Sequence, residues 1–286
     1  MKRLSIYMLA AGMAALSTSC SDFLDTVPKD QLAPSTTWQT EADAKGFIVG
    51  CYKDLLDGNA LLYLDCGSDI GYNNFPWEGF RPWGDGSLSS SNPGQILYDY
   101  KSIRKANTFL ENVDKVTFSS DAVKANYVAQ AKAIRAYKYF LMNWWYGGVP
   151  IVTKVQDPVE SSFVPRSTTK ACIEFICNDL DIAADMLRAK TTNGGWNGDN
   201  YGRVTTASAM ALKGRVLLLW ASPLFNRAND ERRWAAAYEY IKESIKDINA
   251  CGNHLYTTGN NINGSDFAKM FTVIQNPEMV FGTLHN

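Results

Sequence analysis

Residues 121–146 read DAVKANYVAQAKAIRAYKYFLMNWWY, and this stretch decides the fold class. Its apolar residues recur every three or four positions, which is the spacing of one face of an α-helix. Gly147 and Gly148 follow directly and Pro150 comes soon after, a combination that ends helices. The pattern therefore predicts one long helix over 121–146. Its inward stripe is expected to consist of Tyr127, Ala131, Ile134, Tyr137, Leu141 and Trp144.

Five further helices are predicted on either side of this stretch, from caps, helical spacing and terminal glycines. The helix over 41–56 follows a capping-box-like Thr40-Glu41-Ala42-Asp43 and ends before Gly58. The helix over 169–187 follows a cap at Ser167/Thr168. These helices span about 41–56, 93–113, 169–187, 205–221 and 232–250.

The last two helices differ in how they should be buried. The helix over 205–221 is apolar almost all round and is expected to be the most buried. The helix over 232–250 carries apolar residues on one side only. Its inward residues are expected to be Trp234, Tyr238, Ile241, Ile245 and Ile248.

Antiparallel helix pairs rich in alanine and aromatic residues predict a mainly α fold of tetratricopeptide-like pairs. No strict 34-residue sequence repeat is visible. Short alternating runs near 254–258 and 279–284 predict a few short strands. We therefore expect helix pairs joined by long loops, with little sheet.

The first 19 residues have the organisation of a secretory signal. Lys2 and Arg3 are followed by an apolar stretch over 4–16, and three small residues lead into Cys20. Thirteen positions are too few for a membrane-spanning helix, which needs about 20 residues. We expect a lipoprotein signal peptide over 1–19, acylation at Cys20 and an extended tether over 20–39. The alternative is an ordinary cleavage site with Cys20 as a plain thiol.

Charge and cysteine usage exclude several classes of function. Removal of the signal takes away two of 28 basic residues and none of 29 acidic ones, which leaves a net charge of −3. A nucleic-acid partner is not expected, because such proteins carry a basic stripe. Five further cysteines show neither CxxC spacing nor a Cys/His cluster, so zinc is not expected. Cys51 and Cys66 are compatible with a disulfide in an exported protein, and the sequence does not decide whether it forms.

Two long loops, 58–92 and 190–203, combine aromatic and polar residues in an unusual density. Loops of this length in a compact domain are usually functional or disordered, and disordered segments are poor in aromatic residues. A sugar ring stacks its CH face on an aromatic ring, while its hydroxyls bond to amides, carboxylates and guanidinium groups. The candidate ligand residues are Asp69, Tyr72, Asn73, Asn74, Trp77, Arg81, Trp83, Asp85, Trp196 and Asn200.

Other uses of these residues remain open from the sequence. An exposed aromatic cluster with a polar rim also suits a protein partner, and packing within the loop is the third alternative for 58–92. Trp144 and Trp145 at a helix end are expected to be packing residues. The run 197–200 has oxygen ligands for calcium but lacks the spacing of an EF-hand loop.

The familiar catalytic motifs are missing from the sequence. There is no GxSxG elbow, HExxH helix, Walker loop or GxGxxG turn, and His254 and His285 are the only histidines. Paired carboxylates for sugar hydrolysis would not show as a local motif. We expect a binding protein without catalytic activity, cofactor or metal.

A series of blocks resembles the SusD/RagB-like outer-membrane lipoproteins. The mature start CSDFLDTVPKDQLAPSTTWQTEADAKGFIVGCYKDL is one, and YDYKSIRKANTFLENV and AQAKAIRAYKYFLMNWWYGGVPIV follow it in order. VPRSTTKACIEFICNDLDIAADML, GRVTTASAMALKGRVLLLWASPLF and NPEMVFGTLHN complete the set. Together the blocks cover most of 20–286.

The resemblance implies a surface-exposed lipoprotein, anchored in the outer membrane, with a helical-repeat domain over 40–286. It implies capture of an oligosaccharide or polysaccharide and its delivery to a SusC-like TonB-dependent transporter. In the family pattern the loop between the first two helices contributes to the ligand surface, and 58–92 has that position here. Family members are usually far longer, so the domain is expected to be incomplete at its C-terminus. Capture of a peptide, or a purely structural contact with the transporter, are the alternatives.

Overall fold

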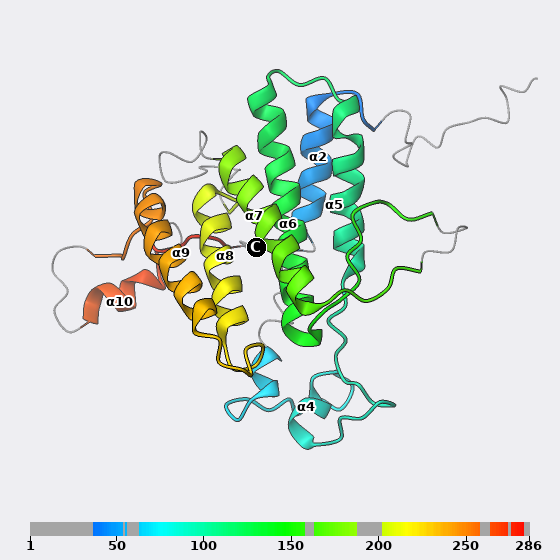
Figure 1. The fold of residues 1–286 in the computed structure, drawn as a ribbon, viewed down its shortest axis with the longest axis vertical. Coiled ribbons are helices and arrows are strands. Elements are labelled where there is room, and N and C mark those ends of the chain that lie inside the picture. The colour runs from blue at the N-terminus through cyan, green and yellow to red at the C-terminus, as the bar shows by residue number, and fades with distance from the viewer. Residues whose placement is uncertain are drawn as a thin grey trace, which may run out of the picture. The chain divides into compact units, whose positions relative to one another are not determined.

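The computed structural model describes residues 37–53, 55, 63–157, 163–187, 202–257, 264–273 and 276–282. The chain divides into two units, Met1–Trp38 and Gln39–Asn286, and the second contains all the described helices (Figure 1). These are α2 (Glu41–Tyr52), η2 (Leu64–Gly67), α4 (Arg81–Asp85), α5 (Tyr100–Asn112), η3 (Val113–Lys115), α6 (Asp121–Tyr146), α7 (Thr169–Leu187), α8 (Thr206–Ala221), α9 (Glu231–Ala250) and α10 (Ser265–Met270).

The long helix α6 has the bounds that the sequence predicts. Its N-terminus is capped by Ser120, whose hydroxyl accepts a hydrogen bond from the Val123 N–H. At the other end Gly147 adopts a positive φ of 70°, and its N–H donates to the Asn143 carbonyl. Because glycine has no Cβ, it reverses the chain here without strain.

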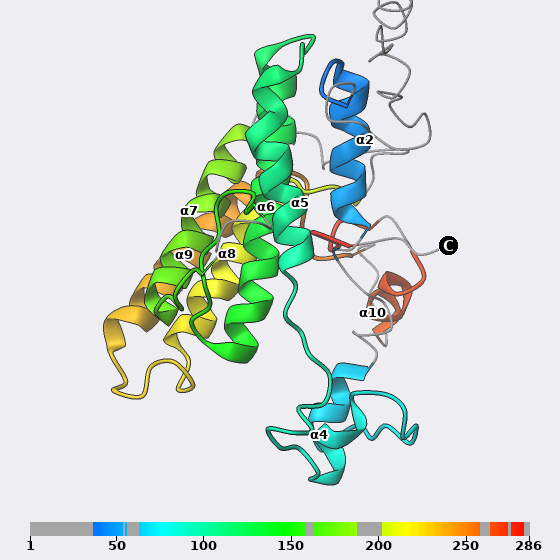
Figure 2. The same cartoon turned by 90° about the vertical axis from the view of Figure 1, so that its right-hand side faces the viewer.

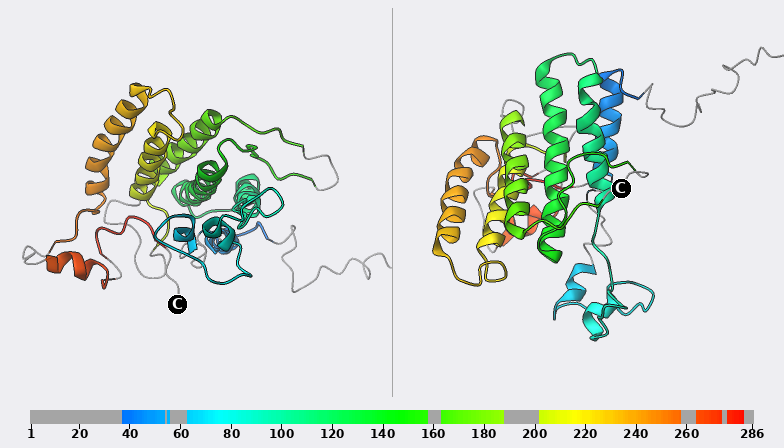
Figure 3. Two further views of the ribbon diagram at one scale, coloured as in Figure 1. Left: turned by 90° about the horizontal axis from the view of Figure 1, so that it is seen from below. Right: turned by 45° about the vertical axis from the view of Figure 1, so that its right-hand side comes forward.

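Neighbouring helices pack in chain order, α5 on α6, α6 on α7, α7 on α8 and α8 on α9, as Figures 2 and 3 show. The helix α2 packs against both α5 and α6. This sequential pairing is the arrangement of tetratricopeptide-like repeats and confirms the mainly α fold.

The most buried helix is α6, and the prediction that 205–221 would be the most buried is wrong. Helix α6 contacts α2, α5, α7 and α8, so most of its surface between the first and last turns is covered. Helix α8 has neighbours mainly in α7 and α9, and its Arg215 and Leu218 are exposed. An apolar sequence therefore did not determine which helix lies in the centre.

Helix α9 also differs from its prediction. Trp234, Tyr238 and Ile245 are exposed rather than inward, because α9 packs mainly against α8. Ile241 does face α8, where a Cβ on Gly214 would lie 3.1 Å from its Cγ1. The small Gly214 therefore allows the close approach of the two helices.

The predicted helix over 93–113 begins later, at Tyr100. Asp99 caps it, with its Oδ1 accepting from the Ser102 N–H at 3.1 Å. The preceding Gly94 has a φ of 67°, which is incompatible with a helix. Residues 93–99 therefore form a non-helical connection, and α5 ends at Asn112, directly before η3.

The strands predicted near 254–258 and 279–284 are not formed in their described parts, 254–257 and 279–282. The two segments do lie side by side, since the His254 N–H donates to the Pro277 carbonyl and the Asn253 amide donates to the Pro277 and Met279 carbonyls. A strand pair needs a continuous ladder of backbone hydrogen bonds, and Pro277 has no N–H to donate to one.

A buried ion cluster joins α6 to α7. The Asp179 carboxylate accepts from the Arg135 guanidinium at 2.8 and 3.0 Å and from the Lys132 ammonium at 3.1 Å. Arg135 also donates to the Asn107 side chain of α5, and lies over the ring of Phe175. Removing one partner from such a buried group is costly, because a charge remains unpaired. The cluster therefore fixes the register of three helices.

Among the described helices, none has the combined length and apolar character that a membrane span requires.

Candidate functional site

The described part of the long loop, residues 63–92, is called here the α4 segment. It lies beyond the end of α6 and the start of α5 (Figures 1 and 2). The connection from this segment to α5 is fastened at two points, where the Leu97 N–H donates to the Tyr146 hydroxyl and the Asp99 carboxylate pairs with Lys138 at 2.8 Å. The segment is thus a folded part of the domain, attached to the end of α6.

Trp83 attaches the α4 segment to α6. Its ring centroid lies 5.0 Å from that of Trp145 and 5.1 Å from that of Phe80. Two glycines make room for it, since a Cβ on Gly94 would lie 2.6 Å from the indole nitrogen and one on Gly67 3.1 Å from the ring. Trp83 is half-buried, so much of its surface serves packing.

Asn73 holds the turn of the α4 segment together through side-chain hydrogen bonds. Its side chain donates to the Glu78 carboxylate at 2.6 Å and accepts from the Phe75 N–H at 2.8 Å, and it is buried. Its amide is thereby used within the protein. The structure gives Asn73 the role of positioning the aromatic residues that follow it.

The aromatic side chains on the outer side of this turn are exposed. Trp77 is 77% exposed, and its ring centroid lies 5.2 Å from that of Phe75, which is also exposed. We call Phe75 and Trp77 the outer aromatic pair. Tyr72 is a third exposed ring of the same turn. Phe75 was missing from the predicted set, because the turn that brings it against Trp77, closed by the Glu78 N–H donating to the Phe75 carbonyl, was not predicted.

Polar candidates occur in the same segment. Asp69 and Asn74 are exposed, and Arg81 pairs with Asp85 at 3.4 Å along α4. The hydrogen bond from Ser87 lowers the pKa of the Asp85 carboxyl, and Arg81 contributes to the same shift, so this carboxylate is ionised at neutral pH. The segment thus combines flat apolar rings with charged and amide hydrogen-bonding groups.

Trp144 and Trp145 at the end of α6 were expected to be packing residues, and the structure exposes 39% and 40% of their surfaces. Both still have ring neighbours, because Trp144 contacts Phe140 and Trp145 contacts Trp83. The two indoles therefore pack in part, and the rest of each ring is exposed at the end of α6.

Three predicted residues lie outside the described part of the chain, namely Trp196, Asn200 and the acylation candidate Cys20. The possible calcium loop at 197–200 lies outside it as well. Within the described residues no group of His, Cys, Asp or Glu is arranged to hold a metal ion. Cys51 and Cys66, left open as a disulfide, both remain thiols, and both are buried.

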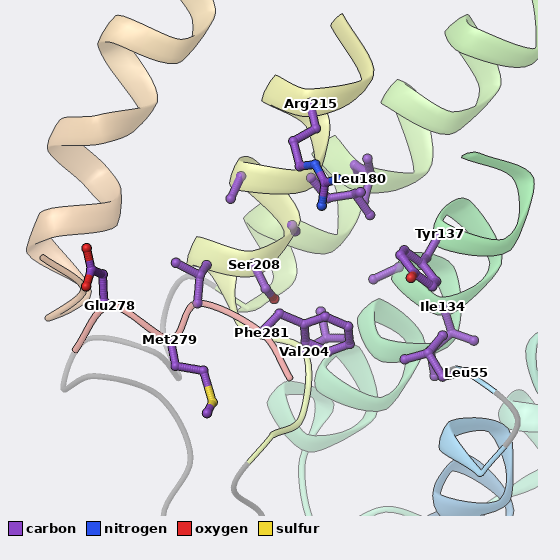
Figure 4. A pocket seen from close by; sticks show the side chains of 15 residues that line it. Leu55, Ile134, Tyr137, Leu180, Val204, Ser208, Arg215, Glu278, Met279 and Phe281 are labelled. Atoms are coloured by element: carbon purple, nitrogen blue, oxygen red, sulfur yellow. The ribbon is translucent and has the colours of Figure 1, made fainter. Parts of the chain in front are cut away.

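A separate hollow of about 450 Å³ lies between α6, α7, α8 and the segment 276–282 (Figure 4). Its wall is mainly apolar, and the Tyr137 and Phe281 rings approach edge to face with centroids 6.4 Å apart. Arg215 and Glu278 are its charged residues. It shares no residue with the α4 segment, and it was not predicted because its walls come from distant parts of the sequence.

Comparison with known proteins identifies the family. A model for SusD-like proteins, described as starch-binding and associating with the outer membrane, matches residues 22–218. The chain belongs to the SusD-like family. The match covers more than half of the chain and includes the α4 segment and helices α2 to α7.

Individual SusD-like proteins support this assignment. A SusD-like protein of Formosa agariphila is 28% identical over 183 residues, which are 58% of this chain and 34% of that protein. The crystal structure of a SusD-like protein of Bacteroides fragilis has the same fold, with a TM-score of 0.69, 24% identity and coverage of 91% of this chain and 48% of that one. A laminarin-binding SusD-like protein has a TM-score of 0.62 at 21% identity, over 79% of this chain and 50% of that one. The chain spans half or less of the length of each of these relatives.

Proposed function

We propose that this SusD-like protein captures an oligosaccharide or polysaccharide at the bacterial surface, with the α4 segment as part of the binding face. The observation that carries the proposal is the outer aromatic pair, which is exposed on a turn held from inside by Asn73. A ligand that covers large exposed aromatic rings removes their apolar surface from water, which is favourable. Their exposure therefore indicates a binding surface.

The chemistry of the segment suits a sugar. The face of a pyranose ring is weakly polar and stacks on Trp77 or Tyr72, while Asn74, Asp69 and Arg81 offer acceptors and donors for its hydroxyls. The Arg81–Asp85 pair is solvent-accessible and therefore available to exchange partners at modest cost. Because Asn73 fixes the turn, little conformational entropy is lost on binding.

We extend the proposal to the location of the protein and to its partner. We infer a signal peptide over 1–19, acylation at Cys20, and a tether over 20–39 that holds the domain at the outer face of the outer membrane. The bound glycan would be delivered to a SusC-like TonB-dependent transporter without being cleaved. The association with the outer membrane in the family description and the fold shared with a laminarin-binding protein support this proposal.

Isothermal titration tests the binding site. The full chain, purified in mild detergent, is titrated with starch and laminarin fragments and with a mixture of peptides as the alternative ligand. Trp77→Ala is expected to weaken glycan binding about tenfold, which corresponds to roughly 1.4 kcal/mol. Tyr238→Ala removes an exposed ring from α9, outside the α4 segment, and is expected to change nothing.

The possible results separate the proposals. Unchanged glycan affinity in the Trp77 variant contradicts the site. Binding of peptides instead of glycans favours a peptide-capturing protein, and co-purification with a transporter without any ligand binding favours a purely structural role.

A further inference from the structure

The hollow between α6, α7, α8 and the segment 276–282 has the character of a small-molecule site (Figure 4). Its volume of about 450 Å³ falls within the roughly 300–1,000 Å³ that is usual for ligand pockets. Buried aliphatic side chains form much of its wall, namely Ile134, Leu180, Val204 and Ala209. Such a wall favours a ligand with an apolar body.

The part of the wall formed by 276–282 is held in place by hydrogen bonds. The Asn253 amide donates to the Met279 carbonyl at 3.2 Å. The Asn276 amide donates to the Val273 carbonyl at 2.9 Å. Because this wall is fixed before a ligand enters, little conformational entropy is lost on binding.

Two hydrogen-bond donors in the lining of the hollow have no partner of their own. Figure 4 shows the guanidinium of Arg215 turned toward the interior of the hollow, which the Tyr137 side chain also lines. Neither the guanidinium nor the Tyr137 hydroxyl has a hydrogen bond or an ion pair within the described ranges of the chain. Burial raises the pKa of the Tyr137 hydroxyl, and the charge of Arg215 acts in the opposite direction, so the two groups are close enough to interact. The hydroxyl therefore keeps its proton and is available to donate it to a ligand.

These groups select among classes of ligand. A guanidinium fork donates two hydrogen bonds to a carboxylate, and a neighbouring hydroxyl can donate a third. A sugar suits the hollow poorly, because most of its hydroxyls would face apolar walls without a partner. Figure 4 shows Glu278 at the opposite end of the hollow from Tyr137, where its charge disfavours a second anionic group. The hollow therefore suits a ligand with one carboxylate and an apolar body.

We propose that this hollow is a binding site for an apolar monocarboxylate of the fatty-acid class. The carboxylate lies between Arg215 and Tyr137, and the aliphatic chain covers the apolar wall. The site is separate from the proposed glycan surface, since it shares no residue with the α4 segment. It gives the protein a second ligand of a different chemical class.

Photolabelling with a matched pair of probes tests the proposal. The full chain in mild detergent at pH 8 is irradiated with a diazirine derivative of decanoic acid, and separately with the same derivative of decanol, over a range of probe concentrations. Mass spectrometry of the peptides that line the hollow gives an apparent Kd for each probe. Micelles take up part of each probe to the same extent for every variant, so ratios between variants are unaffected. We expect the acid probe to label the hollow of the wild type.

Two variants test the carboxylate contacts. Arg215→Gln is expected to weaken binding of the acid probe about fivefold and that of the alcohol probe by less than about twofold, because only the carboxylate uses the charge. Tyr137→Phe keeps the ring beside Phe281 and removes only the hydroxyl. It is expected to weaken binding of the acid probe about threefold.

Arg227→Gln is the matched control, since it removes an exposed guanidinium outside the hollow and should behave as wild type. Circular dichroism checks that each variant is folded. A wild type that is not labelled at the hollow overturns the proposal, and so does unchanged affinity for the acid probe in Arg215→Gln. An equal loss for both probes also overturns it, because it shows that Arg215 supports the wall instead of binding the carboxylate. None of these results changes the glycan titration, so the proposed function is tested separately.

Discussion

At the scale of single residues, Asp99 combines two tasks at the start of α5. Its carboxylate caps the helix through the Ser102 N–H and pairs with Lys138 of α6 at 2.8 Å. Burial acts to raise the pKa of this carboxyl, but the hydrogen bonds from Lys138 and Ser102 outweigh it, and the pKa is lowered. The ionised form is therefore favoured in the folded protein.

Asp99→Ala is expected to lower the free energy of unfolding at neutral pH, by about 1–2 kcal/mol from loss of the cap. Because the folded pKa lies below the ordinary value of 3.8, the contribution of the charge is complete above pH 3.8 and is lost as the pH falls through the folded pKa. Urea unfolding as a function of pH measures the difference. Asp99→Asn keeps a cap and should lose less, and a difference between wild type and Asp99→Ala that does not shrink in acid would refute the argument.

At the scale of elements, the α4 segment depends on glycines for its contact with Trp83. Gly94 has a φ of 67° and Gly86 a φ of 77°, so an alanine at either position is strained. Only at Gly94 would the new Cβ also collide with the Trp83 indole, at 2.6 Å, while nothing lies within 4 Å at Gly86. Comparing an alanine at Gly94 with one at Gly86 therefore separates the effect of backbone strain from that of the collision with Trp83.

Gly94→Ala is expected to displace the α4 segment and to speed its cleavage by chymotrypsin, which has a site after the half-buried Trp83. Gly86→Ala is the matched control and carries only the strain of a left-handed residue, about 1–2 kcal/mol. Limited proteolysis measures the opening of the segment, and circular dichroism checks that the helices remain. Equal cleavage rates for the two variants would show that the Trp83 contact does not hold the segment.

At the scale of the whole molecule, the proposed location at the outer membrane depends on the first 20 residues. An acylated Cys20 provides several lipid chains, and stable anchoring needs more than one lipid signal. Cells fed a palmitate analogue are expected to label the wild-type protein, and Cys20→Ala is expected to abolish the label. Cys51→Ala is a suitable control, because Cys51 is buried and should not be acylated. Label retained on the Cys20 variant would place the modification elsewhere.

The helices were predictable from the sequence because their signals are local. The caps at Thr40 and Thr168 and the stop at Gly147 each involve only a few neighbouring residues, and the structure uses all three. The start of α5 was placed too early because the cap at Asp99 was missed, although Gly94 already indicated a break.

The tertiary structure alone decided which apolar residues are covered. Burial depends on neighbours that are distant in the chain, so Tyr238 is exposed on α9 and Trp144 is exposed at the end of α6. The same is true within the candidate site, where composition predicted an aromatic and polar loop. The packing of that loop directs Asn73 inward, fixes Trp83 against Trp145 and leaves Trp77 exposed, because these contacts depend on the approach of the loop to α6.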